Sequence, residues 1–313
     1  MIPLALVGIG KIATDQHVPA LVSSTDFRLV ATVSLDGSVE GVPSYRTIAD
    51  MLDAHREVEA VSFSVPPMPR FRLAEEALTG GRHVMLEKPP GATIAECHRL
   101  EALAREREVA LYASWHSREA ASVARARAWL ADRRIDAVRL IWKEDVRRWH
   151  PGQTWIFEPG GLGVFDPTIN AFSILTRILP VPFHLTEATL MVPENAQAPI
   201  AAELRFHLPG GAPMTADLDF LQEGEQIWRI EVETDGGPLI LADGGASLTV
   251  AGAAVGDAGA GDNATLAGEY PRLYANFANL VVARAIDMDL SPMVHVADAY
   301  LIGRRVSVAA FHH

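Results

Sequence analysis

Short apolar runs alternate with amphipathic segments along the first third of the chain. Runs with the character of strands lie at residues 4–9, 29–33, 60–65, 83–86 and 109–114. Segments whose apolar residues recur at helical spacing lie between them at residues 12–22, 48–54, 71–78 and 94–106. Strand followed by helix in this order predicts a parallel, doubly wound sheet with right-handed crossovers.

The pattern changes after a further helical segment at 120–130. The strand-like runs that follow have few long helices between them, and they lie at residues 138–143, 186–192, 200–207, 215–220, 227–234 and 238–241. This spacing is typical of a largely antiparallel sheet. Helical patterns at 165–179, 270–285 and 294–311 accompany it, and the Ala-, Gly- and Asp-rich stretch 251–268 indicates a loop or hairpin tip.

The change of pattern divides the chain into two expected domains. A length of 313 residues is enough for two hydrophobic cores. We expect an α/β domain over 1–117 and an α+β domain with a largely antiparallel, open sheet over 118–313. The C-terminal helix of the second domain is a candidate to pack back on the first.

Composition excludes several classes of partner. Aspartate and glutamate outnumber lysine and arginine by 39 to 27, which gives a net charge of -12. Nucleic acids and anionic membrane surfaces attract basic proteins, so we expect neither as a partner and favour a small-molecule ligand. The single cysteine, Cys97, cannot form an internal disulfide. The apolar opening lacks a basic leader, and no apolar stretch approaches the ~20 residues of a membrane span, so we expect a cytoplasmic protein.

A glycine motif lies where the first strand-like run meets the first helical segment. Gly8, Gly10 and Ala13 have the G-x-G-x-x-A spacing of dinucleotide-binding folds. Gly8 permits a tight turn, and Gly10 lets backbone N–H groups at the start of the helix approach a pyrophosphate. The alternative is a glycine turn that binds nothing. The context of strand, motif and helix favours a Rossmann-type domain that binds NAD or NADP.

The end of the second strand offers little to distinguish the two cofactors. Ser34 occupies the position expected for the ribose-binding residue, and a neutral hydroxyl tolerates either cofactor. Leu35 brings no guanidinium to hold a 2′-phosphate. Asp36 would repel a phosphate if it turned inward, but it is equally well explained as a turn residue before Gly37.

Longer motifs resemble those of a known oxidoreductase family. Gly8-x-Gly10-x-x-Ala13, Pro66-Pro67 and Glu87-Lys88-Pro89-Pro90-Gly91 resemble the glucose-fructose oxidoreductase, inositol dehydrogenase and MocA family, and the match extends over the whole chain. The blocks 115–117, 142–152 and 158–167 are similar to bacterial aldose 1-dehydrogenases that act on L-arabinose or D-galactose. The resemblance implies NAD(P)-dependent oxidation of an aldose at its anomeric carbon, with D-fucose as a further substrate. Another sugar or polyol dehydrogenase, or a dinucleotide-binding sensor without catalysis, is the alternative.

Lys88 is the first catalytic candidate. It follows an apolar strand directly and precedes Pro89, so it lies at the carboxyl edge of the parallel sheet, where ligands bind in open α/β folds. The alternative is a surface lysine at the end of a strand. The resemblance implies that the Lys88 amine bonds the reacting hydroxyl and lowers the pKa of that hydroxyl.

Asp166 and Asn170 are the other catalytic candidates. They are four residues apart, so they share one face of a helix. Asp166 could alternatively cap that helix, since Pro167 suits its first turn. The resembling family commonly has a histidine proton acceptor where this chain has Asn170. An amide does not accept a proton at neutral pH, so we assign the base to Asp166 with help from Lys88, and give Asn170 the role of orienting the sugar.

The remaining site residues complete the expected picture. His116, Glu144, His150 and Trp149 offer polar groups and an aromatic face for a sugar, although each could instead be a packed residue at the end of a strand. The expected dinucleotide site comprises Gly8, Gly10, Lys11, Ile12, Ser34, Pro66, Glu87 and Lys88. The histidines have no paired ligand spacing, so we expect no metal. The resemblance also suggests a homodimer.

Overall fold

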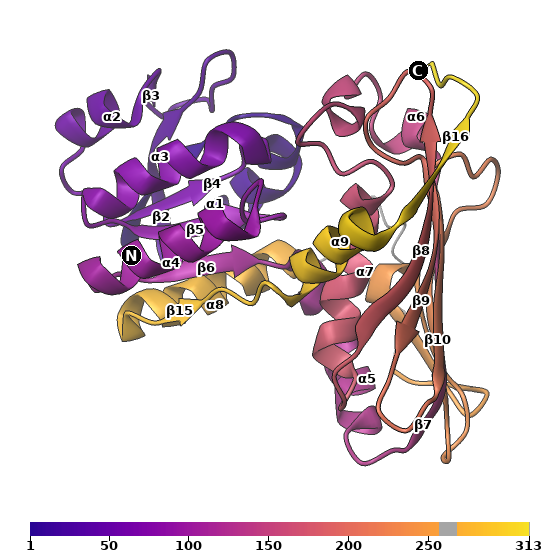
Figure 1. The fold of residues 1–313 in the computed structure, drawn as a ribbon. Helices are drawn as coiled ribbons and strands as arrows, with labels where there is room; N and C mark the ends of the chain where they lie inside the picture. The colour runs from indigo at the N-terminus through magenta and orange to yellow at the C-terminus, as the bar shows by residue number, and fades with distance from the viewer. Residues whose placement is uncertain (257–267, 313) are drawn as a thin grey trace. The chain divides into compact units, whose positions relative to one another are not determined.

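A computed structural model describes residues 1–256 and 268–312 of the chain. It divides into two compact units (Figure 1). Unit 1 combines Met1–His116 with Gly268–Leu290, and unit 2 combines Ser117–Ala267 with Ser291–His313. The segment 268–290 therefore belongs with the first 116 residues of the chain, which the change of pattern along the sequence does not reveal.

Unit 1 is built on a seven-stranded sheet with strand order β15-β6-β5-β4-β1-β2-β3. The strands are β1 (Ile2–Val7), β2 (Phe27–Val33), β3 (Ser44–Tyr45), β4 (Ala60–Phe63), β5 (His83–Glu87), β6 (Leu111–Ser114) and β15 (Ile286–Asp287). Neighbouring strands pair in parallel throughout, which confirms the doubly wound sheet. β15, a strand of two residues that the apolar pattern did not predict, adds to the edge of the sheet beside β6.

The helices of unit 1 connect these strands. They are η1 (Ala13–His17), α1 (Val18–Val22), α2 (Ile48–Ala54), α3 (Pro67–Thr79), α4 (Ile94–Arg107) and α8 (Glu269–Ala283). α4 begins at a capping box in which Thr93 and Glu96 satisfy each other's backbone N–H groups. α3 packs against α2 and α4, while α1 packs against α8. The helices therefore form two packed groups, α2, α3 and α4 in one and α1 and α8 in the other.

Unit 2 contains a nine-stranded sheet of order β14-β13-β12-β11-β7-β10-β9-β8-β16. The strands are β7 (Ile135–Lys143), β8 (His184–Pro193), β9 (Ala201–His207), β10 (Pro213–Asp219), β11 (Ile227–Thr234), β12 (Leu239–Ala242), β13 (Ser247–Val250), β14 (Ala253–Ala254) and β16 (Arg304–Val308). Six of the eight pairings are antiparallel, while β10 with β7 and β16 with β8 are parallel. The largely antiparallel sheet is thereby confirmed.

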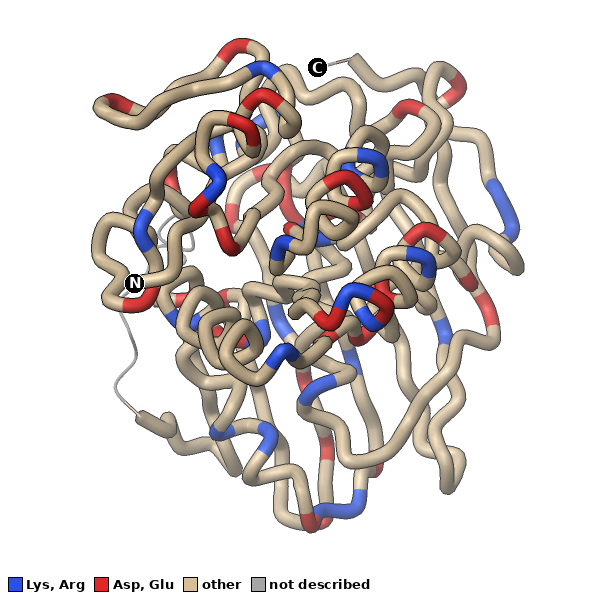
Figure 2. The backbone as a smooth tube through the Cα atoms, turned by 90° about the vertical axis from the view of Figure 1, so that its left-hand side faces the viewer, with Lys and Arg blue, Asp and Glu red and all other residues tan. Residues whose placement is uncertain are grey.

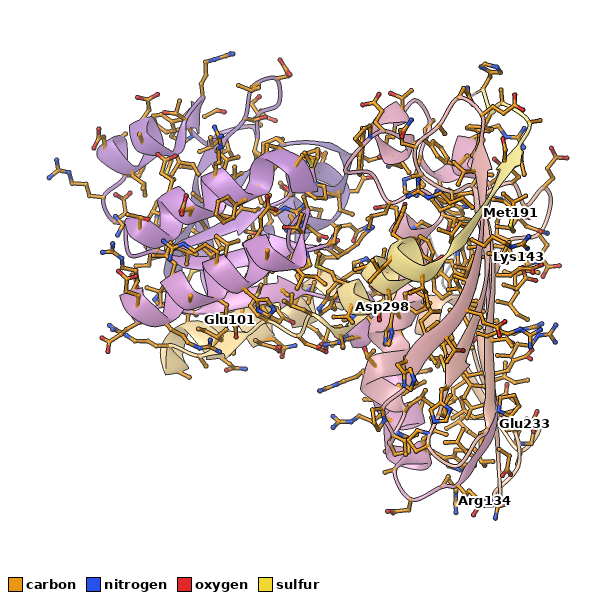
Figure 3. All side chains as sticks on the ribbon, viewed as in Figure 1. Glu101, Arg134, Lys143, Met191, Glu233 and Asp298 are labelled. Atoms are coloured by element: carbon orange, nitrogen blue, oxygen red, sulfur yellow. The ribbon has the colours of Figure 1, made fainter. Side chains whose placement is uncertain are left out.

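Helices cover one face of this sheet (Figure 1). They are α5 (Val123–Leu130), α7 (Phe165–Ile178) and α9 (Ser291–Ile302), and shorter helices α6 (Val146–Trp149), η3 (Thr154–Phe157) and η4 (Asp243–Gly245) join the strands; η2 (His116–Glu119) lies at the boundary of the units. α7 packs against both α5 and α9. Side chains on the other face include Lys143, Met191 and Glu233 (Figure 3).

The helix expected over 294–311 is wrong in its second half. α9 ends at Ile302, and the chain continues as the edge strand β16 alongside β8. A Cβ atom at Gly303 would lie 2.3 Å from the carbonyl oxygen of Ala299, so the close turn out of the helix requires glycine. The apolar positions after Gly303 belong to a strand, because the exposed edge of β8 offers backbone partners that the local sequence does not reveal.

The expected loop over 251–268 is described in part. Its beginning forms β14, and residues 257–267 lie outside the described residues. Acidic and basic positions are interspersed along the described chain (Figure 2). No helix within 1–256 and 268–312 is long and apolar enough to cross a membrane.

Candidate functional site

The glycine motif forms the turn between β1 and the helical segment that starts unit 1. Gly8 has a φ of 89°, and a Cβ there would lie 2.6 Å from a side-chain atom of Val65, so both its conformation and its packing require glycine. At Gly10, a Cβ would meet nothing within 4 Å. The open space beside this second glycine fits the close approach of a pyrophosphate to the backbone.

Ser34 follows β2 beside this turn. Its Oγ accepts hydrogen bonds from the N–H groups of Ile9 and Gly37, at 3.4 and 3.1 Å, and its hydroxyl hydrogen has no acceptor in the described part of the chain. Arg46 Nη1 donates to the carbonyl oxygen of Leu35 at 3.3 Å. A guanidinium therefore lies beside Leu35, although Leu35 itself has none. Lys11 forms an exposed ion pair with Asp15, one helical turn away.

Lys88 lies where β5 ends, next to the carboxyl ends of β4 and β6, and the Lys88–Pro89 peptide bond is cis. The backbone around it is held by Arg70, whose guanidinium donates to the carbonyl oxygens of Glu87 and Pro89. Arg70 also donates to the carbonyl oxygen of Val65, which precedes Pro66. The two motifs expected to line the cofactor, at Pro66 and at Glu87-Lys88, are thus joined by one side chain.

Glu87 is buried, and its carboxylate accepts three hydrogen bonds. Oε1 accepts from Nε2 of His17 at 3.2 Å and from the Tyr270 hydroxyl at 2.7 Å, while Oε2 accepts from the N–H of Lys88 at 2.8 Å. The Tyr274 hydroxyl extends this group, because it lies 2.8 Å from Nδ1 of His17. η1, which ends at His17, and α8 therefore both contribute to holding the end of β5.

These contacts determine the charge of Glu87. Burial by itself raises its pKa, but the hydrogen bond and charge of His17, the charge of His116 and the hydrogen bond from Tyr270 outweigh burial and lower the pKa to about 2. Burial, followed by the charge of Glu87, raises the pKa of Tyr270. At neutral pH Glu87 is consequently an anion, and Tyr270 keeps the hydroxyl proton that it donates to Glu87.

The lowered pKa of Glu87 predicts a pH-dependent contribution to stability. Since the folded pKa lies below the unfolded one, the contribution is fully present above the unfolded pKa and is lost as the pH falls toward the folded value. A shift from 4.5 to about 2 corresponds to about 3 kcal/mol. We expect Glu87→Gln to lower the free energy of unfolding most near neutral pH, and the deficit to shrink below about pH 5.

Urea unfolding of wild type and Glu87→Gln between about pH 7 and about pH 3 measures this deficit. Glu101→Gln, which removes a surface ion pair with Arg105, serves as the matched control and should change stability little at any pH. If Glu87→Gln lowered the free energy of unfolding by the same amount at every pH measured, the lowered pKa of Glu87 would be contradicted.

His116 lies at the end of unit 1 and is buried. Its Nδ1 is 2.6 Å from Oε2 of Glu269, and its ring stacks on Tyr270 with centroids 5.6 Å apart. His116, the expected sugar contact, is thus oriented by Glu269 of α8. Glu269 is next to Tyr270, which bonds Glu87. Neither Glu269 nor Tyr270 stood out in the sequence.

Asp166 and Asn170 lie on α7 in unit 2 and share a face of its first turns. The helix begins at Phe165 after Val164, so Asp166 is inside its first turn and is not the N-cap. Asp166 is 5% exposed. Oδ1 of Asn170 is buried and has no hydrogen-bond partner among the described residues. An acceptor in this state is suited to a donor from a ligand, such as a sugar hydroxyl.

The glycine loop before α7 is closely packed. Gly163 has a φ of 57°, and a Cβ there would lie 2.2 Å from the carbonyl oxygen of Pro199. The Tyr300 hydroxyl donates to the carbonyl oxygen of Leu162 at 3.1 Å. The contact with Pro199 explains why position 163 is glycine, and both contacts hold the loop before the helix that carries Asp166.

Glu144, Trp149 and His150 are brought together in unit 2. Oε2 of Glu144 accepts from the indole N–H of Trp228 at 2.7 Å, and Oε1 lies 3.4 Å from Nε2 of His150. The rings of Trp149 and Trp228 are in edge contact, with centroids 5.3 Å apart. Trp149 also donates to Oε1 of Gln226 at 3.1 Å. Gln226, directly before β11 (Ile227–Thr234), and Trp228, inside β11, are thus site residues that sequence reasoning missed.

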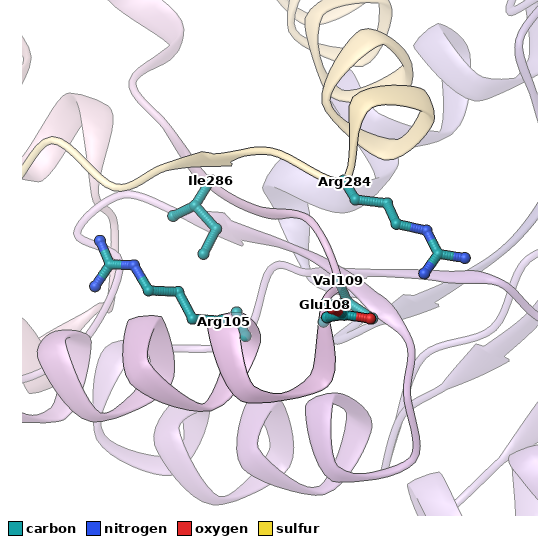
Figure 4. A pocket seen from close by; sticks show the side chains of 6 residues that line it. Arg105, Glu108, Val109, Arg284 and Ile286 are labelled. Atoms are coloured by element: carbon teal, nitrogen blue, oxygen red, sulfur yellow. The ribbon is translucent and has the colours of Figure 1, made fainter.

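A surface hollow in unit 1 lies away from these residues. It measures about 410 Å³ and is lined by Ala104, Arg105, Glu108, Val109, Arg284 and Ile286 (Figure 4). Val109 precedes β6 and Ile286 begins β15, so the hollow is at the amino end of the parallel strands, opposite the edge that carries Lys88. Among the described residues, no group of His, Cys, Asp or Glu could hold a metal ion.

Comparisons with known proteins show which families and structures the chain is similar to. A model of an oxidoreductase family with an NAD-binding Rossmann fold, GFO_IDH_MocA, matches residues 2–114. The chain is 41% identical to a galactose 1-dehydrogenase from Pseudomonas fluorescens, and the alignment covers 99% of both chains.

Solved structures agree with the fold over the full length. A D-galactose-1-dehydrogenase from Rhizobium etli is 50% identical, with a TM-score of 0.94 over 99% of this chain and 98% of that one. A 3-ketoreductase from Actinomadura kijaniata, solved with NADP and TDP-benzene, is 17% identical, with a TM-score of 0.80 over 98% and 99% of the two chains. At that identity the likeness concerns the fold alone.

Proposed function

We propose, from the premise that this chain belongs to the glucose-fructose oxidoreductase, inositol dehydrogenase and MocA family of oxidoreductases, that it is an aldose 1-dehydrogenase. Its substrate would be D-galactose, with L-arabinose and D-fucose as further substrates. The 41% identity to a galactose 1-dehydrogenase over 99% of both chains is the observation that carries the proposal. The expected family and its nicotinamide cofactor are confirmed by the comparisons.

The dinucleotide would be held by the carboxyl edge of the sheet in unit 1. Gly8 shapes the turn, and the open space at Gly10 admits the pyrophosphate to the N–H groups of Lys11 and Ile12. Ser34 would bond the ribose, and Pro66 and Glu87-Lys88 would line the nicotinamide end. Asp36 and Arg46 would bring opposite charges to the ribose end of the site, so we propose that the cofactor is NADP or NAD.

The proposed reaction converts the anomeric carbon into a lactone carbonyl. When bound, the nicotinamide accepts the hydride that leaves C1. Asp166 would accept the proton of the O1 hydroxyl, and the Lys88 ammonium would stabilise the negative charge that develops on that oxygen. Asn170 would accept a hydrogen bond from the sugar through its buried Oδ1. Products are the aldonolactone, the reduced cofactor and one proton.

The sugar itself would be recognised by polar groups and one aromatic face. His116, Glu144 and His150 are each paired with a neighbouring acid or base, which sets the direction in which each can bond a hydroxyl. Trp149 would pack on the C–H face of the ring. L-Arabinose and D-galactose differ at the C5 substituent, and such a group changes binding by only ~1–3 kcal/mol, so one site would accept both.

An assay of cofactor reduction tests the proposal. The panel consists of D-galactose, L-arabinose, D-fucose, D-xylose, D-glucose and myo-inositol, each with NAD and with NADP. We expect the first three sugars to be oxidised with the highest kcat/KM, and 1,5-lactone to be the product by nuclear magnetic resonance. Turnover of myo-inositol alone would exclude the aldose assignment, and inactivity on every pair would exclude the dehydrogenase.

We further propose a homodimer that forms through the face of the nine-stranded sheet opposite α5, α7 and α9. Charged residues on this face neutralise one another, as in the pairs Lys143 with Asp217 and Arg229 with Glu231. Such pairing lowers the cost of covering the face with a second copy. Sedimentation equilibrium should give the mass of two chains, and the mass of one chain would contradict the proposal.

A further inference from the structure

Backbone groups before and after Lys88 are held by two buried side chains of opposite charge. The N–H of Lys88 donates to the Glu87 carboxylate at 2.8 Å. The carbonyl groups of Glu87 and Pro89 both accept from Arg70. Arg70 is 2% exposed and Glu87 is 5% exposed, so water competes little for these bonds.

We propose that Arg70 and Glu87 are positioning residues, which together form a clamp that fixes Lys88 for reaction. The inference rests on the proposed dehydrogenase function, because that function makes Lys88 the group that bonds the reacting hydroxyl. In the chemical step Arg70 and Glu87 act through Lys88 and not through contacts with the sugar.

Each half of the clamp is itself anchored. Glu87 is bonded by His17 from the helix after the glycine turn and by Tyr270 from α8. Arg70 projects from α3 and reaches the Val65 carbonyl in addition to those of Glu87 and Pro89. Motion of Lys88 relative to the glycine turn, or to the backbone before Pro66, would therefore break bonds inside a buried network.

The free energy of folding alone does not explain why two charged side chains are buried beside Lys88. Buried charges are expensive to desolvate, and well-packed apolar residues of similar volume often stabilise a core as well or better. α3 already buries Ala74, Ala77 and Leu78 against the sheet, so an apolar residue at position 70 would suit its buried face. A guanidinium does what no apolar side chain can, because its fork of donors joins three carbonyl groups from two segments.

Such a clamp matters for the proposed reaction because proton handling requires hydrogen-bond geometry. Lys88 must reach the sugar hydroxyl within about 3 Å, and a misplacement of about 1 Å can lower the rate about a hundredfold. A loosened clamp should therefore impair the chemical step while binding of sugar and cofactor persists.

Steady-state kinetics of Arg70→Lys and Glu87→Gln test the clamp. We expect kcat to fall at least tenfold in each, with the KM values for sugar and cofactor within about twofold of wild type. With C1-deuterated sugar, the primary isotope effect on kcat should rise if another step limits the wild-type rate, because hydride transfer then becomes rate-limiting in the variants. If hydride transfer already limits the wild-type rate, the isotope effect should stay at its full value. Arg72→Lys is the matched control, since Arg72 is exposed on the same helix, and it should behave as wild type.

Chemical rescue separates positioning from folding. Added methylguanidinium should restore part of the kcat lost in Arg70→Ala, while methylammonium at the same concentration should not, because only the guanidinium reproduces the planar fork of donors. If Arg70 variants fail to fold, Glu87→Gln, which keeps the shape of the side chain, carries the test.

Amine labelling provides a readout that does not need turnover. The chain has three lysines, Lys11, Lys88 and Lys143, so acetylation by acetic anhydride can be followed at each by mass spectrometry. Release of the clamp should raise the labelling rate of Lys88 more than threefold in Arg70→Lys and Glu87→Gln, while Lys11 and Lys143 label as in wild type.

The outcomes distinguish the two proposals. Wild type that oxidises no sugar, with Lys88 labelling altered by both variants, would refute the proposed function and still support the clamp. Active wild type whose variants keep kcat, isotope effect and Lys88 labelling unchanged would overturn the clamp and leave the function standing.

Discussion

Lys88→Met should lower kcat with D-galactose about a thousandfold, since proton handling by a positioned side chain contributes about a hundredfold to ten-thousandfold. Methionine keeps most of the length of lysine but can neither donate a hydrogen bond nor stabilise negative charge on O1. Binding of the dinucleotide should change little, because the glycine turn and Ser34 supply most of its proposed contacts. The measurements are kcat from cofactor reduction and the cofactor Kd from the fluorescence of the reduced form.

The matched control is Lys143→Met. The Lys143 amine is 2.6 Å from Asp217, on the proposed dimer face of the sheet, so the substitution removes a lysine without changing any residue proposed to bind sugar or cofactor. It should leave kcat unchanged. A Lys88→Met enzyme with kcat within about threefold of wild type would remove Lys88 from the mechanism.

Asp166→Asn should lower kcat about a hundredfold or more, because the amide has the shape of the carboxylate but does not accept a proton. Asn170→Ala should show a different signature. It removes the buried Oδ1 acceptor that orients the sugar, so KM should rise more than kcat falls. Both variants are assayed with D-galactose at saturating cofactor.

The control for this pair is Asp136→Asn. Asp136 is paired with Arg134 on the surface of unit 2, and its removal should not alter kcat. If Asp166→Asn retained full kcat, Lys88 alone would handle the proton. If Asn170→Ala changed neither constant, the buried acceptor would have no part in sugar binding.

Much of the fold could be predicted from local patterns. The strands of the parallel sheet are apolar runs buried on both faces, and the helices between them bury residues three or four apart, as Cys97, Leu100 and Ala104 do on α4. Errors arose where a partner strand decides the conformation. β15 and β16 form because β6 and β8 offer unpaired edges, and short segments acquire their backbone partners only there.

The candidate site likewise has residues that the sequence predicted and residues that it did not. Lys88 and Asp166 stand in long motifs, so the sequence alone placed the proposed chemistry at the end of β5 and at the start of α7. The partners of these residues were not visible. His17 and Glu87 are 70 residues apart, and Tyr270 and Glu87 are 183 apart, so no local spacing connects them.

By itself, the sequence determined the family, the two-sheet architecture and the residues proposed to do chemistry, because periodicity and contiguous motifs are properties of neighbouring residues. The tertiary structure decided what holds these residues in place. It directs the Glu87 carboxylate inward to His17 and Tyr270. It also joins Arg70 to the carbonyl groups of Glu87 and Pro89, and Trp228 to Glu144. Those contacts depend on which distant segments pack together, and packing is a property of the whole folded chain.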